Sequence, residues 1–221
     1  MGNLSKNSNL RKFFLLILSL SLFVGFYFNE DSSSGGVSTD FHATWDYVLV
    51  IKENLFINTD WLSSETWTRV LPLHYIILSQ LDTIIPGVKI ITDKRDLLRL
   101  FFCFLSLSIP ILFYFNLKIK FPNLNKNILW YLSSIILIIP YFRSSAIWAN
   151  SHITALIFFL LSILFFLKWD KKNNHTNVDL NLVFQSLFLA LAVYTRQYYV
   201  IFFIYYLFIY FQKLKFLNFI K

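Results

Sequence analysis

The side chains that could do acid–base chemistry are concentrated in one stretch of this 221-residue chain, residues 29–96. Ten of the twelve acidic residues fall in it: Glu30, Asp31, Asp40, Asp46, Glu53, Asp60, Glu65, Asp82, Asp93 and Asp96. The remaining two, Asp170 and Asp179, lie in a part of the chain rich in Phe, Leu, Ile and Tyr. A polar active site is therefore expected within residues 29–96.

Asp40 is the carboxylate best placed to act as a general base, because it follows the flexible, helix-breaking segment Asn29–Gly36 and opens an amphipathic stretch. The alternative role for Thr39 or Asp40 is capping of the helix that this stretch predicts, running to about Leu55. Asp46 lies on another face of this helix. Its apolar stripe is formed by residues at three- and four-residue spacing and suits the membrane–water interface: Phe41, Trp45, Val48, Leu49 and Lys52.

Arginines near apolar runs are the candidates for binding an anion. Arg196 separates the apolar runs 180–195 and 198–212, so its guanidinium either extends to the membrane surface or holds an anionic group. Arg69 and Arg143 are weaker candidates of the same kind.

Three histidines, His42, His74 and His152, are expected on the same side of the membrane. A divalent metal ion is compatible with them, but no two have ligand spacing on one helix, so hydrogen bonding is the favoured role. No cofactor is required by the sequence. Five glycines form no phosphate-binding loop, which argues against nucleotide hydrolysis, and the single cysteine, Cys103, excludes an internal disulfide and a cysteine metal cluster.

The composition is that of an all-α integral membrane protein. Hydrophobic residues make up 57% of the chain and charged residues 14%, against about 25% charged residues in an ordinary soluble domain. The apolar runs approach the ~20 residues needed to cross a bilayer: 13–28, 97–117, 128–142, 147–167, 180–195 and 198–212. The net charge of +8 comes from Lys and Arg at the ends of these runs, a pattern that sets membrane orientation and does not indicate nucleic-acid binding.

The stretch 70–87 is also apolar, but Pro72, His74, Gln80 and Asp82 make it a costly membrane span. If it does not span, four Lys/Arg clusters fall on one face, as the positive-inside rule favours. We therefore expect about six transmembrane helices. Residues 1–12 form a cytoplasmic N-terminus, 13–28 the first span, 29–96 an extracytoplasmic loop with juxtamembrane amphipathic helices, 97–212 five further spans and 213–221 a cytoplasmic end.

Several short motifs resemble those of the GT-C superfamily of membrane glycosyltransferases. The segment Ser38–His42 follows the first helix as an acidic motif does in that family, and Arg69–Tyr75 is similar to the "P-P-L-x-Y" segment of its RgtA-like and ArnT-like members. Pro140–Ala155 and Thr195-Arg196-Gln197 resemble two later turns of the family, and the dolichyl-phosphate-glucose glucosyltransferase is similar in pattern.

This resemblance implies an inverting transfer of a sugar from a polyprenyl-phosphate donor to a lipid-linked, glycan or protein acceptor, at the outer face of a bacterial inner membrane. Asp40 would be the general base, and Arg196 and Arg69 would bind the donor phosphate. The further candidates for substrate contact are His42, Asp46, His74, Tyr75, Arg143 and His152.

The chain departs from the family pattern at three points. Phe41 stands where the family often has Glu, and Asn150, Ser151 or His152 occupies the second acidic position. Family members are also about twice as long, so the chain resembles their N-terminal module alone. The alternative is a non-catalytic or transporter-like membrane protein, a flippase or scaffold subunit. A transporter should carry polar or broken positions in paired halves, whereas Pro110 and Gln185 alone lie deep within the runs.

Overall fold

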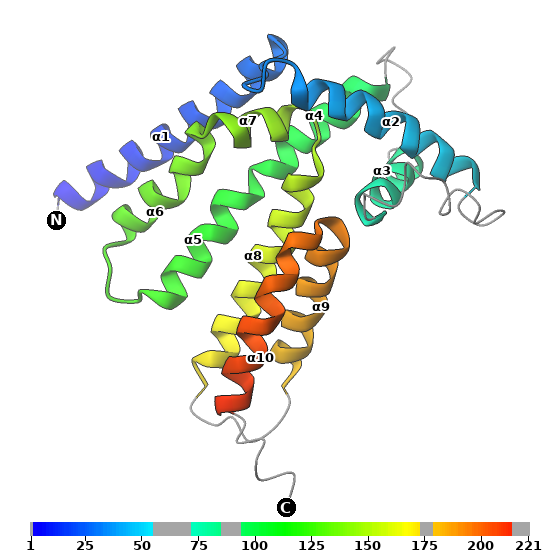
Figure 1. Cartoon of the computed structure of the whole chain (residues 1–221). Helices are drawn as coiled ribbons and strands as arrows, with labels where there is room; N and C mark the ends of the chain where they lie inside the picture. Colours follow the sequence, from blue (N-terminus) through cyan, green and yellow to red (C-terminus); the bar gives the residue numbers. More distant parts are fainter. Residues whose placement is uncertain (1, 55–71, 85–93, 173–178, 214–221) are drawn as a thin grey trace, which may run out of the picture.

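The structure is a computed structural model that describes residues 2–54, 72–84, 94–172 and 179–213 (Figure 1). Throughout these ranges the regular elements are helical, which confirms the all-α prediction. In chain order they are α1 (Gly2–Tyr27), α2 (Gly36–Asn54), α3 (Leu73–Ile84), α4 (Lys94–Ser106), α5 (Ser108–Lys120), α6 (Lys126–Ser134), η2 (Ile135–Ile138), α7 (Pro140–Ile147), α8 (Ser151–Asp170), α9 (Leu180–Thr195), η3 (Gln197–Val200) and α10 (Ile201–Lys213).

The prediction of six membrane-spanning helices is wrong. Within the described ranges, two helical stretches are long and apolar enough to cross a membrane, Arg95–Lys120 (α4 with α5) and Ser151–Asp170 (α8). A third span results if the bent pair Lys126–Ile138 and Pro140–Ile147 is counted as one. α9 has 16 residues and α10 has 13. At 1.5 Å per residue, such helices are shorter than a hydrocarbon core of about 30 Å.

The break in the predicted run 128–142 has a local cause at Pro140. Proline has no backbone N–H to donate and disfavours helical geometry in the residue before it. Ile139 accordingly adopts an extended conformation (φ −66°, ψ 118°), and Pro140 becomes the first residue of α7. The two helical segments are bent by 66°. The apolar run therefore becomes a helix and a separate short helix at the end of the bundle.

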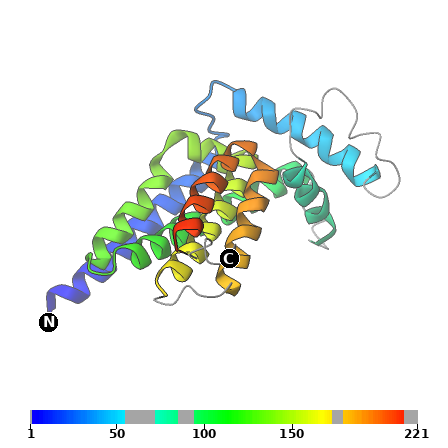
Figure 2. The same ribbon diagram turned by 60° about the horizontal axis from the view of Figure 1, so that its bottom comes forward.

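The helices form a bundle with two distinct ends. α2, α3 and α7 lie towards one end, at the top of Figure 1, while the ends of α5, α8 and α10 lie towards the other. A second view shows α8, α9 and α10 side by side and α2 with α3 set to one side of them (Figure 2). The last turns of α5, α8 and α10 carry lysines: Lys118, Lys120, Lys168 and Lys213. These lysines thus share one end of the bundle, while the side of the membrane that it faces stays a prediction.

α3 is the short apolar helix that the sequence places outside the membrane. It has 12 residues, about 18 Å of helix, which is too few to cross a bilayer. It packs against α2, and Tyr75 and Leu78 of α3 belong to the same buried core as Phe41 and Val48 of α2. The two helices therefore form one unit that covers the end of the bundle.

Candidate functional site

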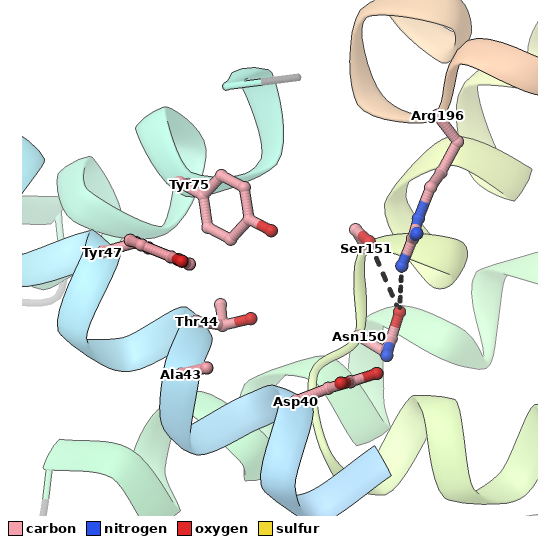
Figure 3. A pocket seen from close by; sticks show the side chains of 8 residues that line it. All are labelled: Asp40, Ala43, Thr44, Tyr47, Tyr75, Asn150, Ser151 and Arg196. Carbon is pink, nitrogen blue, oxygen red and sulfur yellow. Dashed lines mark hydrogen bonds between the residues drawn. The ribbon is translucent and has the colours of Figure 1, made fainter. Parts of the chain in front are cut away.

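A cavity of about 170 Å³ lies between α2 and α3 on one side and the start of α8 and the α9–η3 turn on the other (Figure 3). Its walls are formed by Asp40, Ala43, Thr44, Tyr47, Tyr75, Asn150, Ser151 and Arg196. Three of these residues, Asp40, Tyr75 and Arg196, were singled out from separate stretches of the sequence. The fold thus brings together a carboxylate, a phenol and a guanidinium around one space.

Asp40 is free to face this cavity because other residues cap α2. The helix begins at Gly36, so Asp40 lies in its second turn, and the predicted capping by Thr39 or Asp40 is wrong. Asp31 Oδ2 instead accepts the N–H of Ser38 at 2.9 Å, and Ser33 Oγ accepts the N–H of Val37 at 2.8 Å. Burial raises the pKa of Asp31, but the hydrogen bonds from Ser33 and Ser38 outweigh it and lower the pKa below 3.8.

The cavity-facing side of α2 lies next to its core-facing side. Asp40, Thr44 and Tyr47 recur at helical spacing and line the cavity. Phe41 and Val48 are buried as the predicted stripe requires. Leu49 of the same stripe is 43% exposed, while Ile51, which the predicted stripe did not include, is fully buried. These angular positions follow from the 3.6-residue period once the core contacts are known.

Arg196 is held over the cavity by the residue that caps α8. It lies in extended conformation between α9 and η3, and its Nη2 donates to Asn150 Oδ1 at 3.1 Å. The same oxygen accepts the N–H of His152 at 3.1 Å, which makes Asn150 the N-cap of the 20-residue α8. Arg196 Nε is buried and has no hydrogen-bond partner among the described residues. Donor capacity is therefore left over on the guanidinium.

The electrostatic character of the cavity is divided between its two sides. Arg196 and the start of α8, the positive end of a helix dipole, lie on one side. Asp40 is carried by α2 on the other side and points towards Asn150 (Figure 3), and within the described part of the chain no ion pair of 4.0 Å or less joins it to Arg196. Such an arrangement can hold an anionic group at Arg196 while a carboxylate stands ready to accept a proton nearby.

Tyr75 and its neighbour His74 differ in their relation to the cavity. Tyr75 lines it, packs its ring 5.7 Å from that of Tyr47, and has a pKa raised by burial. His74 lies behind the wall and is 1% exposed. Its Nε2 donates to Ala149 O at 3.1 Å, so its Nδ1 accepts from Thr154 Oγ1 at 3.0 Å. His74 therefore supports the turn before Asn150 and does not reach the cavity.

Three further candidates lie outside the cavity and one cannot be placed. Asp46 is exposed on α2 and does not line it. His42 packs its ring 6.1 Å from Trp148, and His152 Nδ1 pairs with Tyr198 Oη at 2.9 Å. Arg69 lies outside the described residues. Among the residues that are described, no three His, Cys, Asp or Glu side chains gather in a way that could hold a metal ion.

Arg143 joins α1 to α7 instead of facing a substrate. Its Nε and Nη2 donate to the two Glu30 carboxylate oxygens at 2.7 and 2.5 Å. Nη1 and Nη2 also donate to Ser21 Oγ and Ser21 O, both at 2.9 Å. Gly25 makes this approach possible, because a Cβ there would lie 2.2 Å from Glu30 Oε2. The arginine thus uses its fork to bind the protein's own carboxylate.

The residues that sequence reasoning missed are Ala43, Thr44 and Tyr47, and Asn150 and Ser151 were considered only as occupants of an acidic position. The spacing of Thr44 and Tyr47 from Asp40 was a usable signal. Asn150 also carried one, because an Asn directly before a long apolar run is typical of an N-cap. The structure places Asn150 and Ser151, but not His152, on the cavity wall.

Comparison with models of known protein families, with curated proteins and with solved structures finds no match to this chain. The resemblance to GT-C glycosyltransferases therefore rests on the short motifs alone, and a function has to be argued from the cavity itself.

Proposed function

We propose that the protein is an inverting glycosyltransferase that moves a sugar from a polyprenyl-phosphate donor to an acceptor hydroxyl on a lipid-linked, glycan or protein acceptor. One observation carries this proposal: Asp40 and Arg196, from distant parts of the chain, line one cavity without being paired to each other. A general base and a phosphate-binding cation are the two groups that this reaction needs from a protein.

In the proposed reaction Asp40 accepts the proton of the acceptor hydroxyl. The acceptor oxygen then forms a bond to the anomeric carbon of the sugar, while the bond from that carbon to the donor phosphate oxygen breaks. The polyprenyl phosphate leaves with the bonding electron pair, and Arg196 stabilises its growing negative charge. Attack from the side opposite the phosphate inverts the anomeric centre, and Asp40 and Arg196 reach the cavity from different elements, α2 and the α9–η3 turn.

The surroundings of the two charged residues suit a sugar lipid. Tyr47 and Tyr75 offer aromatic surface to the sugar, and Asn150 fixes the direction of the guanidinium. The isoprenoid tail would lie against the apolar helices of the bundle. We place the protein as a multi-pass protein of a bacterial inner membrane. The positive-inside rule favours the lysine-rich end in the cytoplasm, and the cavity, towards the other end of the bundle, then lies at the outer face.

The experiment that tests the proposal measures release of polyprenyl phosphate from a polyprenyl-phosphate sugar by membranes that contain the full chain. This product is the same for every acceptor. Asp40→Asn should lower the rate by about 10²–10⁴-fold, the usual effect of losing a general base. Asp46→Asn removes an exposed carboxylate on the same helix but outside the cavity, and should leave the rate within about two-fold. Equal rates for Asp40→Asn and the parent would favour a flippase or scaffold instead.

A further inference from the structure

A second hollow lies at the other end of the bundle and shares no residue with the Asp40 cavity. It has a volume of about 400 Å³ and lies between the last turns of α5, the second half of α8 and the start of α10. Its walls are mainly aromatic and aliphatic, with Phe159 and Phe166 of α8 and Phe202 of α10 among them. Two polar side chains of α5, Asn116 and Lys120, interrupt this apolar lining.

Asn116 lines this groove and has an unpaired hydrogen-bond acceptor. The residue is 4% exposed, and its Nδ2 donates to Leu160 O at 3.0 Å, which fixes the orientation of the amide. Its Oδ1 is buried and has no hydrogen-bond partner within the described ranges. A buried carbonyl oxygen in apolar surroundings is costly to leave unpaired. The groove therefore suits an occupant that carries a hydroxyl or another donor.

Lys120 adds a positive charge at the mouth of the same groove. It lies in the last turn of α5 and is exposed. Four residues, about 6 Å of helix, separate it from Asn116. A phosphate at Lys120 and a hydroxyl at Asn116 would then belong to one headgroup, while acyl chains follow the apolar wall. A helix of a second copy fits less well, because its backbone N–H groups are bonded within the helix and cannot donate to Asn116 Oδ1.

We propose that this groove binds an anionic phospholipid with a hydroxyl in its headgroup, with the phosphate at Lys120 and the hydroxyl donating to Asn116 Oδ1. The site goes beyond the proposed sugar transfer, because it takes a structural or regulatory lipid from the leaflet opposite the Asp40 cavity. Its test does not depend on any activity of that cavity.

The experiment is native mass spectrometry of the detergent-purified full chain, titrated with three lipids. Phosphatidylglycerol has both a net negative charge and headgroup hydroxyls. Phosphatidylmethanol has the net negative charge alone, and zwitterionic phosphatidylcholine has neither. The fraction of protein that retains a bound lipid is expected to fall from phosphatidylglycerol to phosphatidylmethanol to phosphatidylcholine. Lys120→Gln should lower retention of both anionic lipids about five-fold, the usual effect of one basic residue beside an anionic lipid. Lys118→Gln is the matched control, since Lys118 is exposed in the same turn but does not line the groove.

Two further variants separate a built site from the general lipid annulus. Asn116→Leu should keep phosphatidylmethanol but abolish the preference for phosphatidylglycerol over it. Leu117→Trp, which fills the groove without removing a polar group, should lower retention of both anionic lipids, and a single monodisperse species checks folding of each variant. Equal retention of the three lipids by the parent would overturn the proposal. An equal effect of Lys118→Gln and Lys120→Gln, or a dimer that excludes lipid from the parent, would also overturn it.

Discussion

Replacing Arg196 by lysine tests whether the guanidinium binds a phosphate or merely extends to the membrane surface. In the structure one N–H, on Nη2, is used by Asn150, and the buried Nε has no partner among the described residues. The guanidinium therefore keeps enough donors to bind two phosphate oxygens as a fork. A lysine keeps the positive charge but cannot make two parallel hydrogen bonds from one planar group.

The expected size of the effect follows from the bonds lost. A hydrogen bond to a charged group contributes about 1.5–3 kcal/mol. Losing one of two such bonds should weaken donor binding by roughly 10–100-fold in Arg196→Lys, at about 1.4 kcal/mol per factor of ten. Arg196→Ala removes the charge as well and should weaken binding further. The same Arg→Lys change at Arg95, which lies outside the cavity, should alter binding by less than about two-fold.

The assay is retention of a polyprenyl-phosphate sugar by the purified parent, Arg196→Lys, Arg196→Ala and Arg95→Lys, with monodispersity as the check on folding. Equal binding by the parent and Arg196→Lys would refute the fork and leave a point charge at the surface. Equal binding by Arg196→Ala too would remove the donor site from the proposed reaction.

Two other predictions concern the supports of the site. Arg143→Ala should lower the free energy of unfolding by about 2–3 kcal/mol, somewhat less than for a fully buried pair, because the Arg143 and Glu30 side chains are 14% and 32% exposed. Lys172→Ala breaks a pair whose lysine side chain is 52% exposed, and should lower it by under about 1 kcal/mol in the same denaturation assay. Equal losses for the two variants would contradict the reasoning. Burial lowers the pKa of His74 from 6.5 to about 3. The unfolded chain thus binds a proton that the folded one does not, and stability falls as pH falls below about 6.5, by about 1–2 kcal/mol between pH 6.5 and 5. His74→Phe should remove this part of the pH dependence, and an unchanged pH profile would contradict a buried neutral His74.

The local patterns of the sequence predicted the helices well and the membrane spans poorly. Hydropathy counts apolar residues and does not register a break, so the run 128–142 reads as one span although Pro140 bends it by 66°. The run 97–117 has a helix boundary at Leu107, yet α4 and α5 continue as one long stretch, Arg95–Lys120. The difference is physical. Pro140 removes a backbone donor and forces Ile139 out of the helical region, while Leu107 keeps helical angles (φ −67°, ψ −16°).

Individual residues of the cavity could be selected from the sequence because a charged side chain is energetically costly or unusual in their sequence surroundings. Arg196 lies between two apolar runs, and Asp40 follows a helix-breaking segment that contains Gly35 and Gly36. Their meeting could not be predicted, since it depends on how α2 packs against the start of α8. The capping role was misassigned for a similar reason. Asp31, Ser33 and Asp40 are all chemically suited to cap a helix. Gly35 has a positive φ of 92°, and the helix begins directly after it, earlier than the apolar pattern predicts.

The turn that carries Asn150 indicates why so many buried polar groups surround this site. Ala149 has φ 48°, a conformation that costs a residue with a Cβ free energy. Such a conformation persists where neighbouring contacts fix it. His74 Nε2 donates to Ala149 O, Arg99 Nε donates to Ile147 O at 3.1 Å, and the N–H of Asn150 donates to Ser145 O at 2.9 Å. These donors come from α3, α4 and the turn itself. Three elements therefore hold in place the turn whose Asn150 amide accepts the hydrogen bond from Arg196 at the cavity wall.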